Sequence, residues 1–378
     1  MHADPVEGER STMRVQLVDL GAQYRSIRPE IDAAIQRVLD TTSFILGDEV
    51  HRFETAWARH VGAGGAVGVS SGTAAIELAL RALGVRPGDE VITAAHTFIA
   101  TAEAITNAGA RPVFADIDPA TFAIDPDHVE DLITPRTRAV LPVHLYGHPA
   151  DMGALMDIAA RHDLWVIEDA AQAHGAAIGQ RPVGSIGHLA CFSFYPGKNL
   201  GAYGDAGAVT GNDPVVLDRV RRLRDHGRTT KYEHVEVGFA ERIDALQAAI
   251  LAAKLPHLEA WTEARRRHAR RYVELLSEAG VTVPTEQRGV RHVYHLFVVR
   301  SARRDDLLEH LREAGVMAGI HYPIPLHRQP AYVALGYGDV SLPHTERAAA
   351  EVLSLPIYPE LPDDAIAHVA ATVRSGPA

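Results

Sequence analysis

A lysine lies in a turn rich in glycine and proline, within the segment SFYPGKNLG that spans residues 193 to 201. A carboxylate pair, Glu168 and Asp169, ends an apolar run upstream of this turn. An amine held in such a turn can form a Schiff base with the aldehyde of pyridoxal 5'-phosphate, and a fixed carboxylate can keep the pyridine nitrogen of that cofactor protonated. Lys198 and Asp169 are therefore predicted to be catalytic residues.

Both residues also have ordinary structural interpretations. Lys198 could be a surface lysine, but its place between Gly197 and Gly201, beyond an aromatic strand, favours a partly desolvated amine with a lowered pKa. Asp169 could form a salt bridge or cap a helix, because a carboxylate near a buried strand is costly unless it is paired. Asp169 is preferred to Glu168 because the segment AAQ that follows turns the chain toward the cofactor. Glu168 is expected to be structural.

A phosphate site is predicted where a short strand leads into a helix, at Ser71, Gly72 and Thr73. Free N–H groups and the dipole at a helix N-terminus attract anions, and glycine lets the phosphate come close. A plain helix cap is the alternative. A Walker-type loop is excluded at the lysine turn, because Asn199 stands where serine or threonine would hold magnesium. Phe98 follows another strand and fits either the core or a platform that stacks on a ring.

The other polar clusters are weaker candidates. His144 and His148 lack the acidic or cysteine companions of a metal site, so no metal is predicted. The arginine run at residues 265 to 267 is typical of a solvated helix face. His321 and Tyr322 follow an expected strand and precede a proline, as a substrate-recognition loop requires.

Composition narrows the class of protein. The chain has 378 residues, 47% hydrophobic and 22% charged, which is enough for a large core and two domains. The net charge of -11 argues against a nucleic-acid surface. The lone Cys191 excludes an intramolecular disulfide, fits a reducing compartment, and is expected to be an inert residue facing the core. No apolar run approaches the roughly 20 residues that span a bilayer, and the acidic N-terminus lacks the apolar core of a signal peptide. A cytoplasmic protein without membrane contact is therefore predicted.

The elements that must position these residues alternate between strand and helix, which predicts a mostly parallel sheet covered on both faces. The expected strands are 67–69, 90–93, 112–115, 139–144, 164–168, 189–194 and 207–210. The expected helices are one opening at Pro29, then 74–83, 99–107, 126–133 and 152–162.

The C-terminal part has a different pattern. A long helical stretch from 245 to 276 is interrupted at Pro256, and the elements expected after it are a strand at 293–299, a helix at 305–313, a strand at 316–321 and two helices. The predicted division is a flexible tail at 1–13, a cofactor-binding large domain at 14–251 and a small α+β domain at 252–378.

With these motifs in view, the chain resembles the DegT/DnrJ/StrS family of pyridoxal phosphate-dependent sugar aminotransferases, within the aspartate aminotransferase superfamily. The resemblance covers nearly the whole length, through the segments SGT at 71, HTF at 96, EDAAQAHG at 168, SFYPGKNLG at 193 and HYP at 321. It implies the α/β fold of that superfamily (fold type I): a large domain with a mostly parallel seven-stranded sheet, and a smaller C-terminal α+β domain. It also implies a homodimer whose active sites lie at the subunit interface.

The resemblance assigns a role to each matching residue. It gives Lys198 the Schiff base, Asp169 the pyridine nitrogen and Gln172 a place near the ring hydroxyl. It assigns Phe98 to stacking on the ring, and the phosphate contacts to Gly72, Thr73 and Ser193. His321 and Tyr322 are the choices for the sugar nucleotide.

One position departs from the family pattern. Many members place an asparagine, donated by the neighbouring subunit to the cofactor phosphate, where Ala240 stands in this chain. The contact is then expected from another group such as Arg228. The same absence occurs in relatives that aminate a 3-keto uronic acid sugar nucleotide, which keeps that substrate class open.

The function implied is transfer of an amino group from L-glutamate to a nucleotide-linked keto sugar, a 3-keto hexose linked to dTDP. A UDP-linked 3-keto uronic acid sugar, a 4-keto sugar and an aminocyclitol precursor stay open as alternatives. A non-catalytic pyridoxal phosphate sensor is disfavoured because the chain retains both Lys198 and Asp169, whereas a protein that only binds the cofactor needs neither proton transfer nor an electron sink. Sugar dehydration is disfavoured because that branch of the family has histidine in place of the lysine.

Overall fold

A seven-stranded sheet forms the centre of the computed structural model, which describes residues 13–377; the expected tail at 1–13 lies almost wholly outside the described residues. The strand order is β1-β9-β8-β5-β4-β2-β3, and β9 alone runs antiparallel to its neighbours. The strands are β1 Gly65–Val69, β2 Glu90–Ala94, β3 Arg111–Ala115, β4 Thr137–Leu141, β5 Trp165–Asp169, β8 Leu189–Ser193 and β9 Gly207–Gly211. The predicted mostly parallel sheet of seven strands is confirmed.

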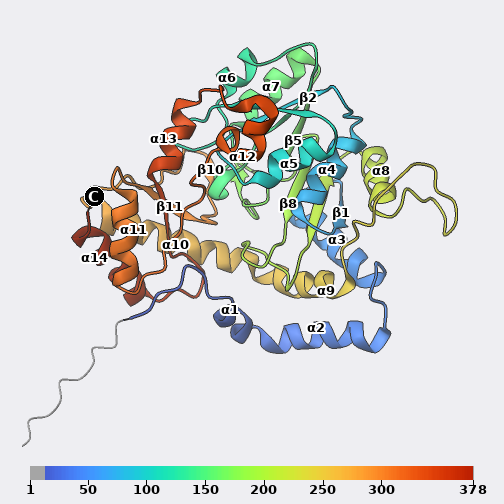
Figure 1. Cartoon of the computed structure of the whole chain (residues 1–378). Coiled ribbons are helices and arrows are strands. Elements are labelled where there is room, and N and C mark those ends of the chain that lie inside the picture. Colours follow the sequence, from blue (N-terminus) through green and yellow to red (C-terminus); the bar gives the residue numbers. More distant parts are fainter. Residues whose placement is uncertain (1–12, 378) are drawn as a thin grey trace, which may run out of the picture.

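Apolar side chains project from both faces of this sheet, so both faces must be covered by other elements. On β8, Leu189 and Cys191 pack into the core beneath α4 and α8, whereas Ala190 and Phe192 pack into the core beneath α3 and α9. Cys191 is buried, as expected. The helices of this part, drawn around the sheet in Figure 1, are α3 Asp48–Val61, α4 Gly72–Ala82, α5 Ile99–Asn107, α6 Pro126–Asp131, α7 Met152–His162, α8 Pro214–Arg224 and α9 Ala245–Lys254.

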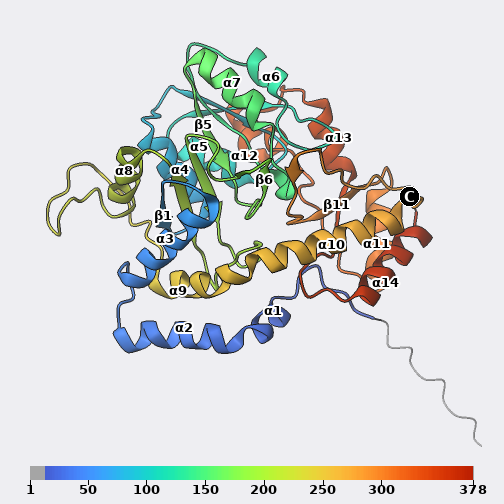
Figure 2. The ribbon, with the colours of Figure 1, turned by 180° about the vertical axis from the view of Figure 1, so that it is seen from behind.

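Two consecutive helices connect the sheet to the C-terminal part. Helix α9 is followed by a single 3-10 turn at Leu255–His257 and then by α10 Leu258–Leu276, so the predicted interruption at Pro256 is confirmed. Figure 2 shows α10 running from α9 toward α11 and α14. The regular elements here are β11 Phe297–Arg300, α11 Arg304–Glu313, α13 Pro343–Glu351, β12 Val352–Leu355 and α14 Asp363–Ser375.

The strand expected at 316–321 does not form. Val316 pairs with Val15 from the N-terminal segment, whereas Gly319 pairs with Ser354, so this stretch is divided between two partners and no continuous ladder develops. The partner of β11 is instead β12, which the sequence pattern did not indicate. The strand expected from residue 293 begins only at Phe297, because Val293 donates its backbone N–H to Gly147.

The remaining elements are short or peripheral. Helices α1 Leu20–Ser26 and α2 Arg28–Thr41 lie beside α9, with α2 in contact with it (Figure 1). A small sheet consists of β6 Ala177–Ile178, β7 Arg181–Pro182 and β10 Val290–Arg291, and α12 covers Pro330–Tyr332. Among the helices between residues 13 and 377, none combines the length and apolar character that a bilayer crossing requires.

Candidate active site

One pocket brings together distant parts of the chain at the carboxyl edge of the sheet, where ligands of open α/β sheets bind. It has a volume of about 500 Å³. Its walls come from Leu17 near the N-terminus, Asp169 at the end of β5, Lys198 after β8 and Ile357 after β12. All the residues predicted to contact the cofactor line it, together with the two predicted for the sugar nucleotide: Gly72, Thr73, Phe98, Asp169, Gln172, Ser193, Lys198, His321 and Tyr322.

Asp169 is a buried carboxylate that has hydrogen bonds but no ion-pair partner among the described residues. Its Oδ2 accepts from the Thr101 hydroxyl at 2.8 Å, and its Oδ1 accepts from the backbone N–H of Ala171 at 3.2 Å. Burial raises the pKa of Asp169, whereas these hydrogen bonds and the charge of Lys198 favour its ionised form. The carboxylate is therefore oriented into the pocket and lacks the adjacent cation that would stabilise it.

The neighbouring Glu168 faces the opposite side of the strand and serves the fold. Its carboxylate accepts from His144 Nε2 at 3.0 Å and from the backbone N–H groups of Gly184, Ile186 and Gly187 at 3.1, 2.9 and 2.8 Å. Burial opposes its ionised form, but the hydrogen bonds from His144 and the backbone outweigh burial and lower the pKa of Glu168. Two adjacent acids thus have different environments, and only Asp169 reaches the pocket.

Lys198 is carried by a tight turn after β8. Its backbone N–H donates to the carbonyl of Tyr195 at 2.8 Å, and a side chain at Gly201 would meet the Pro196 carbonyl at 2.3 Å, so the turn closes only with glycine there. Burial lowers the pKa of Lys198 to about 8, although the charge of Asp169 acts in the opposite direction. No acceptor among residues 13–377 binds Nζ, so the amine is available to a ligand in the pocket.

A second lysine donates a hydrogen bond to this turn. Lys254 is buried, and its Nζ donates to the Gly201 carbonyl at 2.8 Å and to Gln23 Oε1 at 3.0 Å. Its ammonium group lies 4.2 Å from the ring centroid of Tyr203. Lys254 is fully engaged and lies outside the pocket lining, so it positions the turn and does not compete with Lys198.

The N-terminus of α4 forms a cradle for an anion. Ser71 caps the helix by accepting from the backbone N–H of Ala74 at 3.1 Å, which leaves the first-turn N–H groups of Gly72 and Thr73 without intrahelical acceptors. A Cβ atom at residue 72 would lie 2.6 Å from the Cβ of Ser193. Glycine is therefore required for the helix to approach the end of β8, the strand that precedes the Lys198 turn.

Two aromatic rings and an amide line the pocket together. Phe98 is half exposed at the pocket surface, and its ring centroid lies 5.6 Å from that of Tyr322. Gln172 accepts from the backbone N–H of Tyr146 at 2.7 Å and donates to the Tyr322 hydroxyl at 3.1 Å, so its amide orientation is fixed. Tyr146, which the sequence did not indicate, also donates to the backbone carbonyl of His321 and thereby holds the 321–322 loop.

Arg228 does not line the pocket of its own chain. It pairs with Asp225 at 2.5 Å, and the same carboxylate pairs with Arg242 at 2.7 Å. Ala240 forms an isolated bridge with Asp225 in this region. A contact between Arg228 and a pocket ligand would require a second subunit, so that role stays a prediction.

The prediction that Arg265 belongs to a solvated helix face is wrong. Its side chain is 4% exposed, and Nη1 donates to the carbonyls of Tyr294, His295 and Ile357 at 3.3, 3.3 and 2.9 Å. It lines the pocket. The signal was present in the sequence: residue 265 falls in register with the buried stripe of α10, which is Leu258, Trp261, Arg265, His268, Tyr272 and Leu276.

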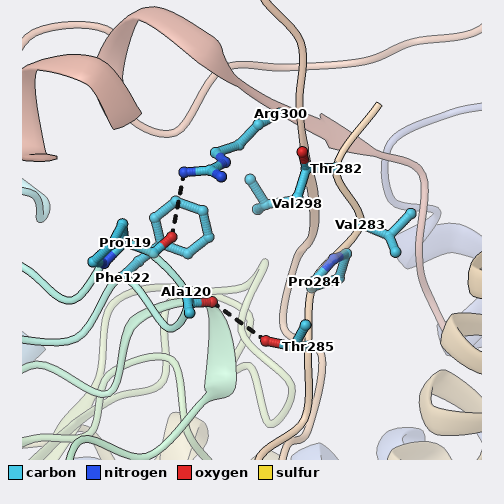
Figure 3. A pocket seen from close by; sticks show the side chains of 9 residues that line it. All are labelled: Pro119, Ala120, Phe122, Thr282, Val283, Pro284, Thr285, Val298 and Arg300. Atoms are coloured by element: carbon cyan, nitrogen blue, oxygen red, sulfur yellow. Dashed lines mark hydrogen bonds between the residues drawn. The ribbon is translucent and has the colours of Figure 1, made fainter. Parts of the chain in front are cut away.

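A second pocket, of about 230 Å³, lies between the 119–122 loop and the segment before β11 (Figure 3). Among its lining residues only Arg300 is charged, and its guanidinium lies 6.0 Å from the Phe122 ring centroid and donates to the Pro119 carbonyl at 3.3 Å. It has neither a free amine nor a carboxylate. The chemistry therefore belongs to the first pocket.

A half-buried lysine and a buried aspartate share one pocket at the edge of the sheet, with a helix N-terminus beside them. This arrangement is typical of aminotransferases with this fold. The chain matches the model of the DegT/DnrJ/EryC1/StrS aminotransferase family over residues 25–374 and belongs to this family. It is a sugar aminotransferase.

Three comparisons are close over nearly the full length. A pleiotropic regulatory protein of Geobacillus stearothermophilus is 49% identical over 93% of this chain and 95% of its own. A dTDP-3-amino-3,4,6-trideoxy-alpha-D-glucose transaminase of Streptomyces venezuelae is 47% identical, with 96% of each chain covered. The solved structure of S. venezuelae DesV in complex with a ketimine intermediate has a TM-score of 0.94 at 47% identity, with 96% of this chain and 98% of that chain covered. Other curated relatives are named as aminotransferases of dTDP-linked or UDP-linked sugars.

Proposed function

We propose that this chain binds pyridoxal 5'-phosphate in the first pocket and transfers an amino group from L-glutamate to C3 of a dTDP-linked keto hexose. The observation that carries the proposal is that Lys198 and Asp169 face one pocket, the first with a free amine and the second with a carboxylate that lacks a cation. A phosphorylated pyridine aldehyde has a partner for each of these groups, and its phosphate suits the first turn of α4.

The other residues of the pocket fit the same cofactor. Gly72, Thr73 and Ser193 would hold the phosphate, because they converge at the helix N-terminus. The half-exposed ring of Phe98 offers a stacking surface, and Gln172 presents an amide of fixed orientation.

When bound, the cofactor supplies an electron sink that makes the α-C–H bond of an amino donor acidic. Lys198 Nζ is suited to take that proton and to return it to a neighbouring carbon, because its pKa of about 8 places both protonation states within reach near neutral pH. The Asp169 carboxylate would stabilise positive charge at the ring nitrogen of the bound cofactor, and the hydrogen bonds from Thr101 and Ala171 hold the carboxylate in place. The aromatic rings of Phe98 and Tyr322 would form one apolar wall beside the cofactor ring.

The replacement Gly72→Ala should weaken binding of pyridoxal phosphate by about 10- to 100-fold, because the new methyl group forces α4 away from Ser193. Titration of the apoprotein, followed by cofactor absorbance, measures this affinity. Gly153→Ala is the matched control: Gly153 lies in α7, away from the pocket, and a Cβ atom there meets only the Asp151 side chain at 3.4 Å. Unchanged affinity in Gly72→Ala would contradict the assignment of the phosphate to this cradle.

The substrate is tested by product identification. The purified holoenzyme, supplied with L-glutamate, should convert a dTDP-linked 3-keto hexose to its 3-amino product, as detected by mass spectrometry. Parallel reactions with a dTDP-linked 4-keto hexose, a UDP-linked 3-keto uronic acid and a keto-cyclitol cover the alternatives. A faster reaction with any of these would move the substrate assignment. A chain that binds the cofactor but turns over no amino donor would be a sensor and would refute the proposal.

A homodimer with shared active sites is part of this proposal. Tyr195 lines the pocket and is 58% exposed, and large apolar side chains are also exposed at Phe44, Tyr232 and Val237. A second copy that covers these side chains would bring its own 225–242 segment toward the phosphate and supply the contact for which this chain, with Ala240, lacks the asparagine of its relatives.

A further inference from the structure

Tyr146 is a buried residue that lies outside the lining of the first pocket and contacts two parts of its wall. Its backbone N–H donates to Gln172 Oε1 at 2.7 Å, and its hydroxyl donates to the backbone carbonyl of His321. Its φ of 59° lies in the left-handed region, which is rare for an aromatic residue. Such a conformation persists only where the surrounding contacts hold it, and it is typical of functional sites.

The loop at residues 320–324, which carries both residues predicted for the sugar nucleotide, depends on side chains for its position. Among the described residues it forms no hydrogen bond between backbone groups. The backbone N–H groups that flank it are those of Gly319, which donates to Ser354, and Leu326, which donates to Ala95. The hydrogen bonds that reach the loop itself come from the side chains of Tyr146, Gln172, Ser354 and Gln329.

His96 fixes the direction of the Tyr146 hydroxyl. His96 Nε2 lies 2.8 Å from the hydroxyl oxygen, and the single hydroxyl proton goes to the His321 carbonyl, which can only accept. His96 Nε2 must therefore carry a hydrogen and donate it. Burial lowers the pKa of His96 to about 4, so the ring is neutral near pH 7, and its Nδ1 has no donor in the part of the chain that the structure describes. A directed chain of hydrogen bonds thus runs from His96 through Tyr146 to His321.

The two contacts of Tyr146 use different groups and can be separated. The contact with Gln172, which is assigned to the cofactor, uses the backbone N–H, whereas the contact with His321 uses the hydroxyl. The ring also packs against Phe122, with 5.4 Å between the ring centroids. Removal of the hydroxyl alone would therefore release the loop, while the ring stays packed and Gln172 keeps its donor.

We infer that His96 and Tyr146 are positioning residues for the keto sugar. They hold the loop in place so that His321 and Tyr322 meet the sugar nucleotide. This inference rests on the proposed function, because it assigns the support of the sugar subsite in the same pocket. The amino donor reacts at Lys198, which is positioned by its own turn and not by this loop. The hydrogen-bond chain therefore serves the half-reaction in which the sugar is aminated.

The experiment measures the two half-reactions of the holoenzyme separately. Stopped-flow absorbance follows the conversion of the bound cofactor to its amine form by L-glutamate, and then the reaction of the amine form with increasing concentrations of the keto sugar that the wild type converts fastest. Tyr337 provides the matched control, because its buried hydroxyl also donates to a backbone carbonyl, that of Pro112 at 2.7 Å, outside the pocket. The variants are Tyr146→Phe, His96→Leu, His96→Gln and Tyr337→Phe.

Tyr146→Phe should lower the efficiency of the sugar half-reaction by about 10- to 30-fold, because the His321 carbonyl and the buried N–H of His96 lose their partner. The loss should appear mainly as a higher sugar concentration at half-maximal rate. The rate with L-glutamate should change less than about twofold, and the absorbance maximum of the bound cofactor should not move. His96→Leu should show the same defect, and His96→Gln should recover most of the efficiency, since its amide can also donate. Tyr337→Phe should match the wild type.

Hydrogen exchange of the apoprotein gives a readout that does not depend on catalysis. In Tyr146→Phe and His96→Leu, the backbone amides of Gly319 and Leu326 should exchange at least about fivefold faster than in the wild type, because the loop between them is released. Tyr337→Phe and His96→Gln should leave these amides unchanged.

Equal losses in both half-reactions of Tyr146→Phe, or a selective loss of the sugar half-reaction in Tyr337→Phe, would overturn the inference and leave the hydrogen-bond chain with a general role in stability. An unchanged sugar half-reaction in Tyr146→Phe would overturn it as well. A wild-type amine form that reacts with no keto sugar would instead refute the proposed function, and hydrogen exchange alone would then decide whether the chain of hydrogen bonds holds the loop.

Discussion

Replacing Lys198 with alanine should lower the rate of both half-reactions on the order of 10⁴-fold or more, because the variant lacks the amine that moves the proton. The cofactor should still bind, since the Gly72 cradle and the Asp169 carboxylate are untouched. Single-turnover absorbance with L-glutamate measures the loss. Borohydride reduction of the wild-type holoenzyme, followed by peptide mass spectrometry, should find the cofactor on Lys198.

The lysine that carries the cofactor can be identified by testing each candidate, because the chain has only three lysines: Lys198, Lys231 and Lys254. Lys231→Ala alters an exposed side chain and should leave the reduced adduct on residue 198. Lys254→Met should loosen the turn by removing the contact with the Gly201 carbonyl, yet leave the reduced adduct on residue 198. Turnover at the wild-type rate in Lys198→Ala, or an adduct on another lysine, would exclude the proposed chemistry.

Asp169→Asn should lower both half-reactions by about 10²- to 10³-fold, since the ring nitrogen loses the fixed negative charge that keeps it protonated. The same change should leave the apoprotein at least as stable at neutral pH. Burial raises the pKa of Asp169, so the ionised carboxylate is disfavoured in the fold, and a neutral amide of the same shape removes that cost. Stopped-flow kinetics and urea unfolding measure the two effects separately.

Glu168→Gln is the informative contrast, because it changes the adjacent acid on the other face of β5. Its carboxylate accepts from His144 and from three backbone N–H groups, and an amide cannot accept from all of them, so a loss of about 2 kcal/mol or more of unfolding free energy is expected. The sign of the pH dependence follows from the lowered pKa of Glu168: its contribution to stability is present above its unfolded-state pKa and is lost as pH falls.

If Asp169→Asn kept full activity, the role assigned to the Asp169 carboxylate would be wrong.

Much of the large sheet could be predicted because each strand there is a short apolar run between helices of clear period. The seven strands of the large sheet and helices α4, α5 and α7 follow the predicted pattern closely, whereas the short strands β6 and β7 were not predicted. Helix α3 was not predicted, although Val50, Phe53, Trp57 and Val61 recur at helical spacing. In the C-terminal part the pattern was less reliable, because pairing there is set by segments far apart in sequence, as Val15 and Val316 show.

The candidate site was predictable where a residue sits in a local motif and unpredictable where it depends on tertiary packing. Lys198, Asp169 and Gly72 lie at junctions between strand and helix or strand and turn, which the sequence marks directly. Thr101 and Tyr146 join the site through contacts across 68 residues to Asp169 and 175 residues to His321, respectively. Arg265 resembled a surface arginine in composition, and only the direction of its helix face places it in the pocket.

The walls of the pocket are drawn from nearly the full span of the polypeptide, from Leu17 to Ile357. During synthesis, Lys198 leaves the ribosome well before the C-terminal segments that complete the wall of this pocket. Closing loops of that length is slow compared with forming local helices. We therefore expect pyridoxal phosphate to bind late in folding. In a refolding experiment, the absorbance of the bound cofactor would report when the last segment of the pocket takes its place.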